Sequence, residues 1–295
     1  MKSSKSSSLL EAILRRDRQV VTLALVAVIT VCWLYLLGGA GTGMYPHEMA
    51  ALNPSIPGMG PSVPSGAGMS WHRMPMQSPE WTPGYTLLMF TMWWLMMIAM
   101  MLPSAAPVVL LHAAVTRKGL APDDDAVPTA SSRQLLRTTT AFVGGYLVVW
   151  GAFSLVAVVA QWMLEREELL SPMMTSTSGL LGSGLLLAAG VWQLTPLKTV
   201  CLRRCRSPIG FVSMHWRSGI RGAFGMGVKH GTYCLGCCWF LMALLFYGGV
   251  MNLIWISGLA LFVLVEKLMP GGDFIRRVTG VLLIAWGAWL GLAAT

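Results

Sequence analysis

Charged residues are scarce in this sequence. Only 11% of its 295 residues are Asp, Glu, Lys or Arg, whereas an average soluble domain has roughly 25%. Hydrophobic residues make up 55%, so long stretches of the chain must face a solvent other than water. This composition excludes an ordinary soluble domain and favours a membrane protein.

Acidic residues are especially few, because the chain has 12 of them against 21 Lys and Arg and a formal net charge of +9. Such an excess of positive charge is also found in proteins that bind nucleic acid. The basic residues here are concentrated in alternate connections between apolar runs, as the positive-inside rule requires of a membrane protein. We therefore expect no nucleic acid as a partner, and the lipid bilayer as the chain's surroundings.

Seven apolar runs are candidates to cross a hydrocarbon core of roughly 30 Å. They are residues 20–37, 85–115, 139–163, 179–197, 231–248, 252–265 and 278–294. The sequence therefore predicts an all-α fold, a polytopic transmembrane helical bundle of about seven spans. The connections 1–19, 116–138, 198–229 and 266–277 carry 19 of the 21 basic residues, which places the N-terminus inside and the C-terminus outside. The expected location is the inner, cytoplasmic membrane of a bacterium.

Three regions follow from this organisation. Residues 1–38 are predicted to be a basic cytoplasmic tail and a signal-anchor helix, because the first apolar run exceeds a signal-peptide core in length and no clear cleavage site follows it. Residues 39–84 are predicted to be an outer loop rich in Met, Pro and Gly. Residues 85–295 are predicted to be a six-span core that handles a metal. No internal repeat indicates inverted transporter halves.

Cysteine is absent from the predicted outer loops. Five of the six cysteines fall on the predicted inner side, where thiols are normally kept reduced, so metal or redox chemistry is expected rather than a disulfide framework. The strongest pattern is His230-Gly-Thr-Tyr-Cys234-Leu-Gly-Cys237-Cys238. In a helix, His230, Cys234 and Cys238 share one face. Thiolates bind soft metals or exchange disulfides, although a buried thiol can also pack as a small hydrophobic group.

A second pair, Cys201 and Cys205, is spaced one helical turn apart on the same predicted side of the membrane. The two elements could together form a four-coordinate site of thiolate and imidazole, although the spacing is not that of a standard zinc finger. Glu266 and Lys267 end the sixth apolar run. An acid at such depth favours a functional role, and the alternative is that these two residues pair with each other at the interface.

Methionine is concentrated in one part of the chain, because 12 of the 21 lie between Met44 and Met101. In the predicted outer loop, His72, Met74 and Met76 combine imidazole and thioether groups, which suit copper in its reduced state. The alternative is a loop whose methionines touch the membrane or a partner.

The second apolar run carries methionines at helical spacing. Met89, Met92, Met96 and Met100 share one helix face, and Met97 and Met101 form another such pair. They form either a ladder of thioether ligands or adaptable packing, since methionine fills irregular gaps. His112, near the inner end of the same run, is a further candidate ligand, and its alternative role is interfacial.

Three motifs carry a family resemblance, within residues 92–104, 195–208 and 230–239. They resemble a family of bacterial integral membrane proteins described as metal-binding and of unknown function. The resemblance extends from about residue 85 to the carboxyl terminus, and it implies metal binding with the cysteine motif as its most distinctive part. The methionine-rich outer loop falls outside it. A looser similarity of methionine spacing, to eukaryotic Ctr-type copper importers, is one of chemistry only.

We therefore expect a membrane protein that handles copper(I), with zinc as a second possible metal. Outer Met and His residues would collect the ion, the ladder would pass it inward and Cys and His residues would receive it, because successively stronger soft donors draw copper inward. Import, buffering or delivery would all suit this pattern, with a copper chaperone or a membrane cuproenzyme as partner and an oligomer as a possible assembly. A non-enzymatic role is favoured. The alternatives are a membrane thiol-disulfide oxidoreductase and a structural metal- or haem-associated subunit of a membrane complex.

Overall fold

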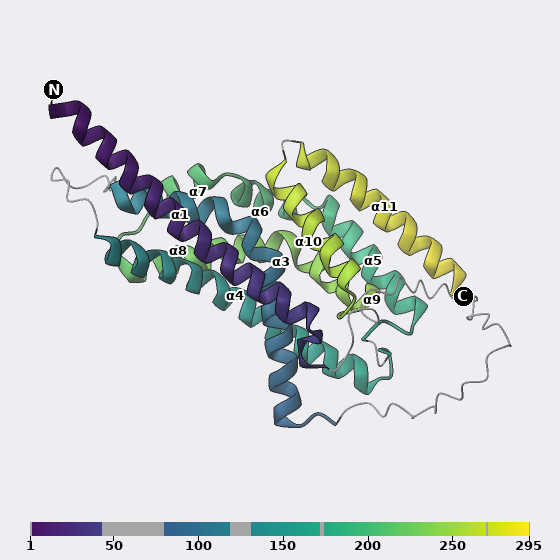
Figure 1. Ribbon diagram of the computed structural model, residues 1–295. Coiled ribbons are helices and arrows are strands. Elements are labelled where there is room, and N and C mark those ends of the chain that lie inside the picture. The colour runs from purple at the N-terminus through teal and green to yellow at the C-terminus, as the bar shows by residue number, and fades with distance from the viewer. Residues whose placement is uncertain (1, 43–79, 119–130, 172–173, 270, 295) are drawn as a thin grey trace, which may run out of the picture.

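The computed structural model describes residues 2–42, 80–118, 131–171, 174–269 and 271–294. Within these ranges the protein is all-α, as predicted, and the extended segments form a single bridge between Leu170 and Ser176. Figure 1 shows the helices packed as one bundle. They are α1 (Lys2–Leu37), η1 (Gly39–Gly41), α3 (Pro83–Lys118), α4 (Ser132–Arg166), α5 (Gly179–Leu194), α6 (Pro196–Arg206), α7 (Pro208–His215), α8 (Gly219–Ala243), α9 (Leu245–Gly248), α10 (Leu253–Leu268) and α11 (Gly272–Ala293).

Five helical stretches of the described chain are long and apolar enough to cross a membrane: 17–37, 83–117, 132–166, 219–248 and 272–293. A sixth is formed if α5 and α6 are taken as one span that is bent by 67°. The predicted run 252–265 is helix α10, whose 16 residues extend about 24 Å, less than a hydrocarbon core of roughly 30 Å. The count by length is therefore five or six rather than seven, and the architecture is that of a membrane protein.

Helix α8 begins at Gly219, earlier than the predicted start at Gly231. The glycines that lower the hydropathy of this segment allow close approach to α4. A Cβ on Gly227 would lie 1.9 Å from the carbonyl oxygen of Phe142, and one on Gly231 would lie 3.0 Å from the side chain of Val149. Small residues at such contacts are the usual basis of helix association in lipid. The contacts advance together along both helices, so α4 and α8 run parallel.

A second glycine interface joins α5 and α11, which lie side by side in Figure 1. A Cβ on Gly190 would lie 2.8 Å from the carbonyl oxygen of Gly280, and one on Gly287 would lie 3.0 Å from the backbone nitrogen of Leu187. The hydroxyl of Ser183 donates a hydrogen bond to the carbonyl oxygen of Gly287 at 2.7 Å. These two helices run antiparallel, and their close contact fixes the position of the bend that follows α5.

Helix α3 lies at the centre of the bundle, in contact with α1, α4 and α10. An ion pair between Arg117 Nε and Asp17 Oδ2, at 2.9 Å, ties its last turn to α1. The predicted methionine ladder faces the interior, because all of its members are buried: Met89, Met92, Met96, Met97, Met100 and Met101. The fold therefore encloses these six thioethers within the bundle.

Candidate metal centre

The bend between α5 and α6 is built by Thr195 and Pro196. The hydroxyl of Thr195 accepts a hydrogen bond from the backbone N–H of Lys198 at 3.3 Å, and Pro196 occupies a first-turn position where no N–H is needed. The carbonyl of Gln193, at the end of α5, accepts a hydrogen bond from the guanidinium of Arg276 instead of continuing the helix. The bend directs α6 against α8, which determines where the second cysteine pair lies.

Three cysteines of α8 are turned into the bundle and are at most 1% exposed: Cys234, Cys237 and Cys238. The thiol of Cys205, on α6, interacts with the thiols of Cys234 and Cys237. Cys201, one turn earlier on α6, packs its sulfur against Gly236 of α8, where a Cβ would lie 2.9 Å away. The structure thus brings together the two cysteine motifs that the sequence assigns to one site. All six cysteines of the chain are free thiols, and metal binding by them stays a prediction.

Cys238 joins this cysteine group to the methionine ladder. Its Sγ lies 3.7 Å from Met101 Sδ on α3. Two sulfur ligands that each bind one ion at about 2.3 Å are roughly 3.8 Å apart when the angle at the metal is tetrahedral. The thiol and the thioether are therefore spaced as two ligands of a single ion without any change in the backbone.

The thiol of Cys234 has two polar neighbours that the sequence did not reveal. Lys267 Nζ donates to Cys234 Sγ at 2.9 Å and to Ser104 Oγ at 3.2 Å. The hydroxyl of Tyr146 lies 3.1 Å from the same sulfur and donates to the carbonyl oxygen of Met101 at 3.1 Å. An ammonium group at this distance stabilises a thiolate, the form of cysteine that binds metals. The sequence contained one indication of the Tyr146 contact, because a Tyr within an apolar helix usually finds a hydrogen-bond partner.

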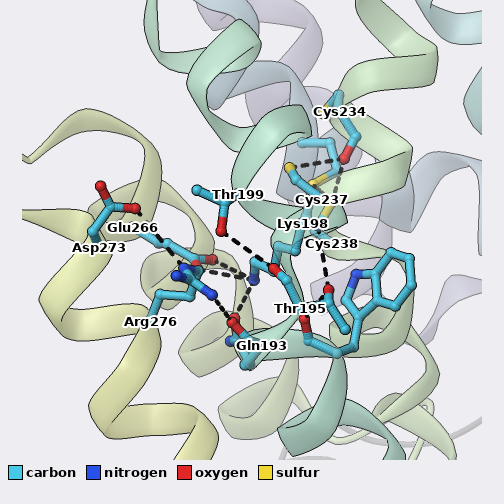
Figure 2. A network of polar contacts seen from close by, with 12 residues as sticks. Gln193, Thr195, Lys198, Thr199, Cys234, Cys237, Cys238, Glu266, Asp273 and Arg276 are labelled. Atoms are coloured by element: carbon cyan, nitrogen blue, oxygen red, sulfur yellow. Dashed lines mark hydrogen bonds and ion pairs between the residues drawn. The ribbon is translucent and has the colours of Figure 1, made fainter.

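Lys198 and Glu266 form a separate ion pair below the cysteines of α8, as Figure 2 shows. Lys198 Nζ lies 2.8 Å and 3.0 Å from the two carboxylate oxygens of Glu266, and it also donates to the side-chain oxygen of Gln193. The two charged side chains are 0% and 1% exposed. The interpretation of Glu266 and Lys267 as an interfacial pair is therefore wrong, because neighbouring residues on a helix point about 100° apart.

Two buried histidines flank the ring of Phe142. The ring of His112 lies 4.9 Å from Phe142 and that of His230 lies 6.2 Å from it, while the ring of His230 is 5.8 Å from Tyr146. Nδ1 of each histidine has no hydrogen-bond partner among the described residues. A buried polar atom without a partner carries a cost that a ligand would remove. The two imidazoles extend the site from Tyr146 towards the C-terminal part of α3.

The candidate metal ligands are mainly the sulfur atoms of Cys and Met, and those in the described part of the chain do not form the four-ligand arrangement of a structural zinc site. Within the described ranges, no three or more His, Cys, Asp or Glu side chains are grouped so that they could hold a metal ion. A structural zinc site needs four such ligands in a tetrahedral arrangement. Thiol and thioether together suit copper(I), which accepts low coordination numbers. The predicted outer ligands His72, Met74 and Met76 lie outside the described residues.

A bundle of apolar helices that encloses thiol and thioether groups defines a membrane protein with donors for a soft metal. Residues 90–290 match the family PpoB2, described as "Copper chaperone", so the chain belongs to this family. The matched region includes the methionine ladder and both cysteine motifs, and it leaves out α1 and the predicted outer loop. No curated protein and no solved structure matches the chain. Family membership therefore associates the protein with copper.

Proposed function

We propose that this protein binds copper(I) inside the membrane, passes it from the thioethers of α3 to the thiols of α8 and delivers it to another protein. The observation that carries the proposal is the 3.7 Å separation of Met101 Sδ and Cys238 Sγ, because it joins the end of the ladder to the cysteine group. The family description as copper chaperones supports both the metal and the delivery.

The ladder provides steps that an ion can bridge. Successive methionines three or four residues apart on α3 are separated by about 4.5–6 Å of helix rise, and flexible thioether side chains can exchange a bound ion over such a step. Thiolate is a stronger soft donor than thioether, so transfer from Met101 to Cys238 is favourable. Lys267, beside Cys234, compensates the negative charge of the thiolate when copper is absent.

Burial separates this role from disulfide exchange. The three α8 cysteines are at most 1% exposed, and an attacking thiolate in an exchange reaction must reach the sulfur of its partner. A disulfide of a second protein could not approach these sulfurs without opening of the bundle, whereas a single ion can travel along the ladder. This geometry supports metal handling over a thiol-disulfide oxidoreductase.

We further propose that the N-terminus faces the cytoplasm and that copper moves along α3 towards the cytoplasmic side. The distribution of 19 of the 21 basic residues in alternate connections supports this orientation. The recipient would then be a cytoplasmic copper chaperone or a membrane cuproenzyme. In this orientation α5–α6 and the short α10 both count as crossings, so the C-terminus lies outside. Reporter fusions at the C-terminus test the orientation, because a periplasmic reporter should be active there and a cytoplasmic one inactive.

The binding step is tested by titrating copper(I) into protein purified in detergent without oxygen, against a competing chelator. We expect at least one tight copper(I) site in the wild-type protein, and the loss of that tight site when Cys234, Cys237 and Cys238 are together changed to Ser. Cys32→Ser is the matched control, since Cys32 is buried in α1 and away from the motif. Retention of full binding in the triple variant, or no binding by the wild type, would show that the proposal is wrong.

A further inference from the structure

A second group of sulfur and carboxylate atoms surrounds the side-chain amide of Gln161, near the end of the bundle where α3 begins. Gln161 Nε2 lies 2.7 Å from Glu165 Oε1, 3.4 Å from Met89 Sδ and 3.6 Å from Met174 Sδ. Gln161 Oε1 accepts a hydrogen bond from Trp93 Nε1 at 2.8 Å. Because the indole can only donate, this bond determines that the NH₂ group points at the sulfurs and the carboxylate.

This arrangement contains more acceptors than donors. The amide NH₂ has two hydrogens, yet three acceptor groups converge on it, so one acceptor always lacks a proton. The other oxygen of Glu165 accepts from Trp81 Nε1 at 2.9 Å, and none of the ion pairs within the described ranges includes Glu165. Gln161 is completely buried and Glu165 is half-buried. The half-buried carboxylate of Glu165 therefore has no cationic partner among the described residues, and a bound cation would supply one.

Met174 reaches this group from an unusual backbone conformation. Its φ angle is 55°, in the left-handed region that residues other than glycine rarely adopt. Two backbone hydrogen bonds hold it there, from Met174 N to Ser171 O at 2.8 Å and from Val250 N to Met174 O at 3.2 Å. The side chain is nevertheless buried, with its sulfur beside Gln161. Strained backbone that is retained at such a point is typical of a ligand-binding position.

We propose that Met89, Met174 and Glu165 form a copper(I)-binding site, separate from the cysteine group, in which the incoming ion displaces the amide of Gln161. Two thioethers select the reduced, soft ion, and the half-buried carboxylate attracts a cation from water. Met92 follows Met89 by about 4.5 Å of helix rise, so the site supplies the first step of the ladder. The inference rests on the proposed function and identifies where copper is received.

Silver(I), a redox-inert analogue of copper(I), is the probe. The site is isolated by titrating the full chain in which the three α8 cysteines are Ser, with and without Met89→Leu and Met174→Leu. We expect one silver equivalent that the methionine changes remove or weaken at least about tenfold. Met226→Leu, a buried methionine near the start of α8, is the matched control and should leave binding unchanged. Equal silver binding with and without the two changes would overturn the inference.

A second measurement uses the wild-type cysteines. The indole N–H resonance of Trp93, assigned with Trp93→Phe, should shift when silver(I) displaces the Gln161 amide, and it should not shift in the Met89→Leu, Met174→Leu variant. A missing shift in the wild type would also overturn the inference. If the wild type binds silver at its cysteines but the methionine changes have no effect, only this site is wrong. If no form binds silver, the proposed function itself fails.

Discussion

Removing one member of the Lys198 and Glu266 pair should destabilise the protein strongly, whereas removing both should not. The charges are 2.8 Å apart, and their side chains are 0% and 1% exposed. At an effective dielectric constant of about 20, such a pair attracts by about 6 kcal/mol, which is offset by the cost of taking two charges out of water. Either Lys198→Met or Glu266→Met leaves one buried charge without a partner, which costs roughly 3–5 kcal/mol.

The assay is a double-mutant cycle on the free energy of unfolding, measured in mixed detergent and SDS micelles. The Lys198→Met, Glu266→Met double variant replaces the pair with apolar groups of similar volume, so its stability should lie within about 1–2 kcal/mol of wild type. Arg277→Met, at an exposed position on α11, is the control and should change stability by less than about 0.5 kcal/mol. Single variants as stable as the wild type, or a double variant that loses the sum of both, would refute the reasoning.

Gly227→Ala should destabilise the protein by about 1–3 kcal/mol or prevent its accumulation in the membrane, because the new Cβ would lie 1.9 Å from the carbonyl oxygen of Phe142. Gly225→Ala on the same helix meets nothing within 4 Å and should be neutral or stabilising in the same thermal unfolding assay, so equal losses would contradict the packing argument. Lys267→Met should weaken copper(I) binding roughly tenfold at pH 7, because Cys234 must then lose a proton to bind the ion. Chelator competition at pH 7 and pH 9 checks this, since the difference in copper(I) affinity between variant and wild type should shrink at the higher pH. A variant that matches the wild-type affinity at both pH values would argue against the lysine's role.

The helices and the methionine ladder could be predicted because they depend on local patterns. Long apolar runs without charged residues predict membrane-spanning helices, and methionines three and four residues apart share a helix face. The same spacing predicted that His230, Cys234 and Cys238 lie on one side of a helix, and the structure confirms that this segment is helical and that all three side chains are buried.

The partners across helices could not be predicted, because they depend on how closely the glycine-containing faces approach. Hydropathy placed Gly231 at the start of a span, whereas Gly227, one turn before it, packs against the backbone of α4. The separate partners of Glu266 and Lys267 follow from the position of α10 between α3 and α6, which no local pattern contains. The group around Gln161 includes Met174 from a loop, and its sequence signals are limited to the ladder spacing of Met89 and an amide within an apolar helix.

X-ray absorption of the copper(I)-loaded wild-type protein, with Met101→Leu for comparison, tests the central claim most directly. The account predicts a first shell of sulfur at about 2.3 Å that loses one sulfur in the Met101→Leu variant, because thiol and thioether share the ion at the junction of α3 and α8. A first shell made of nitrogen and oxygen, or a sulfur shell that Met101→Leu leaves unchanged, would contradict it.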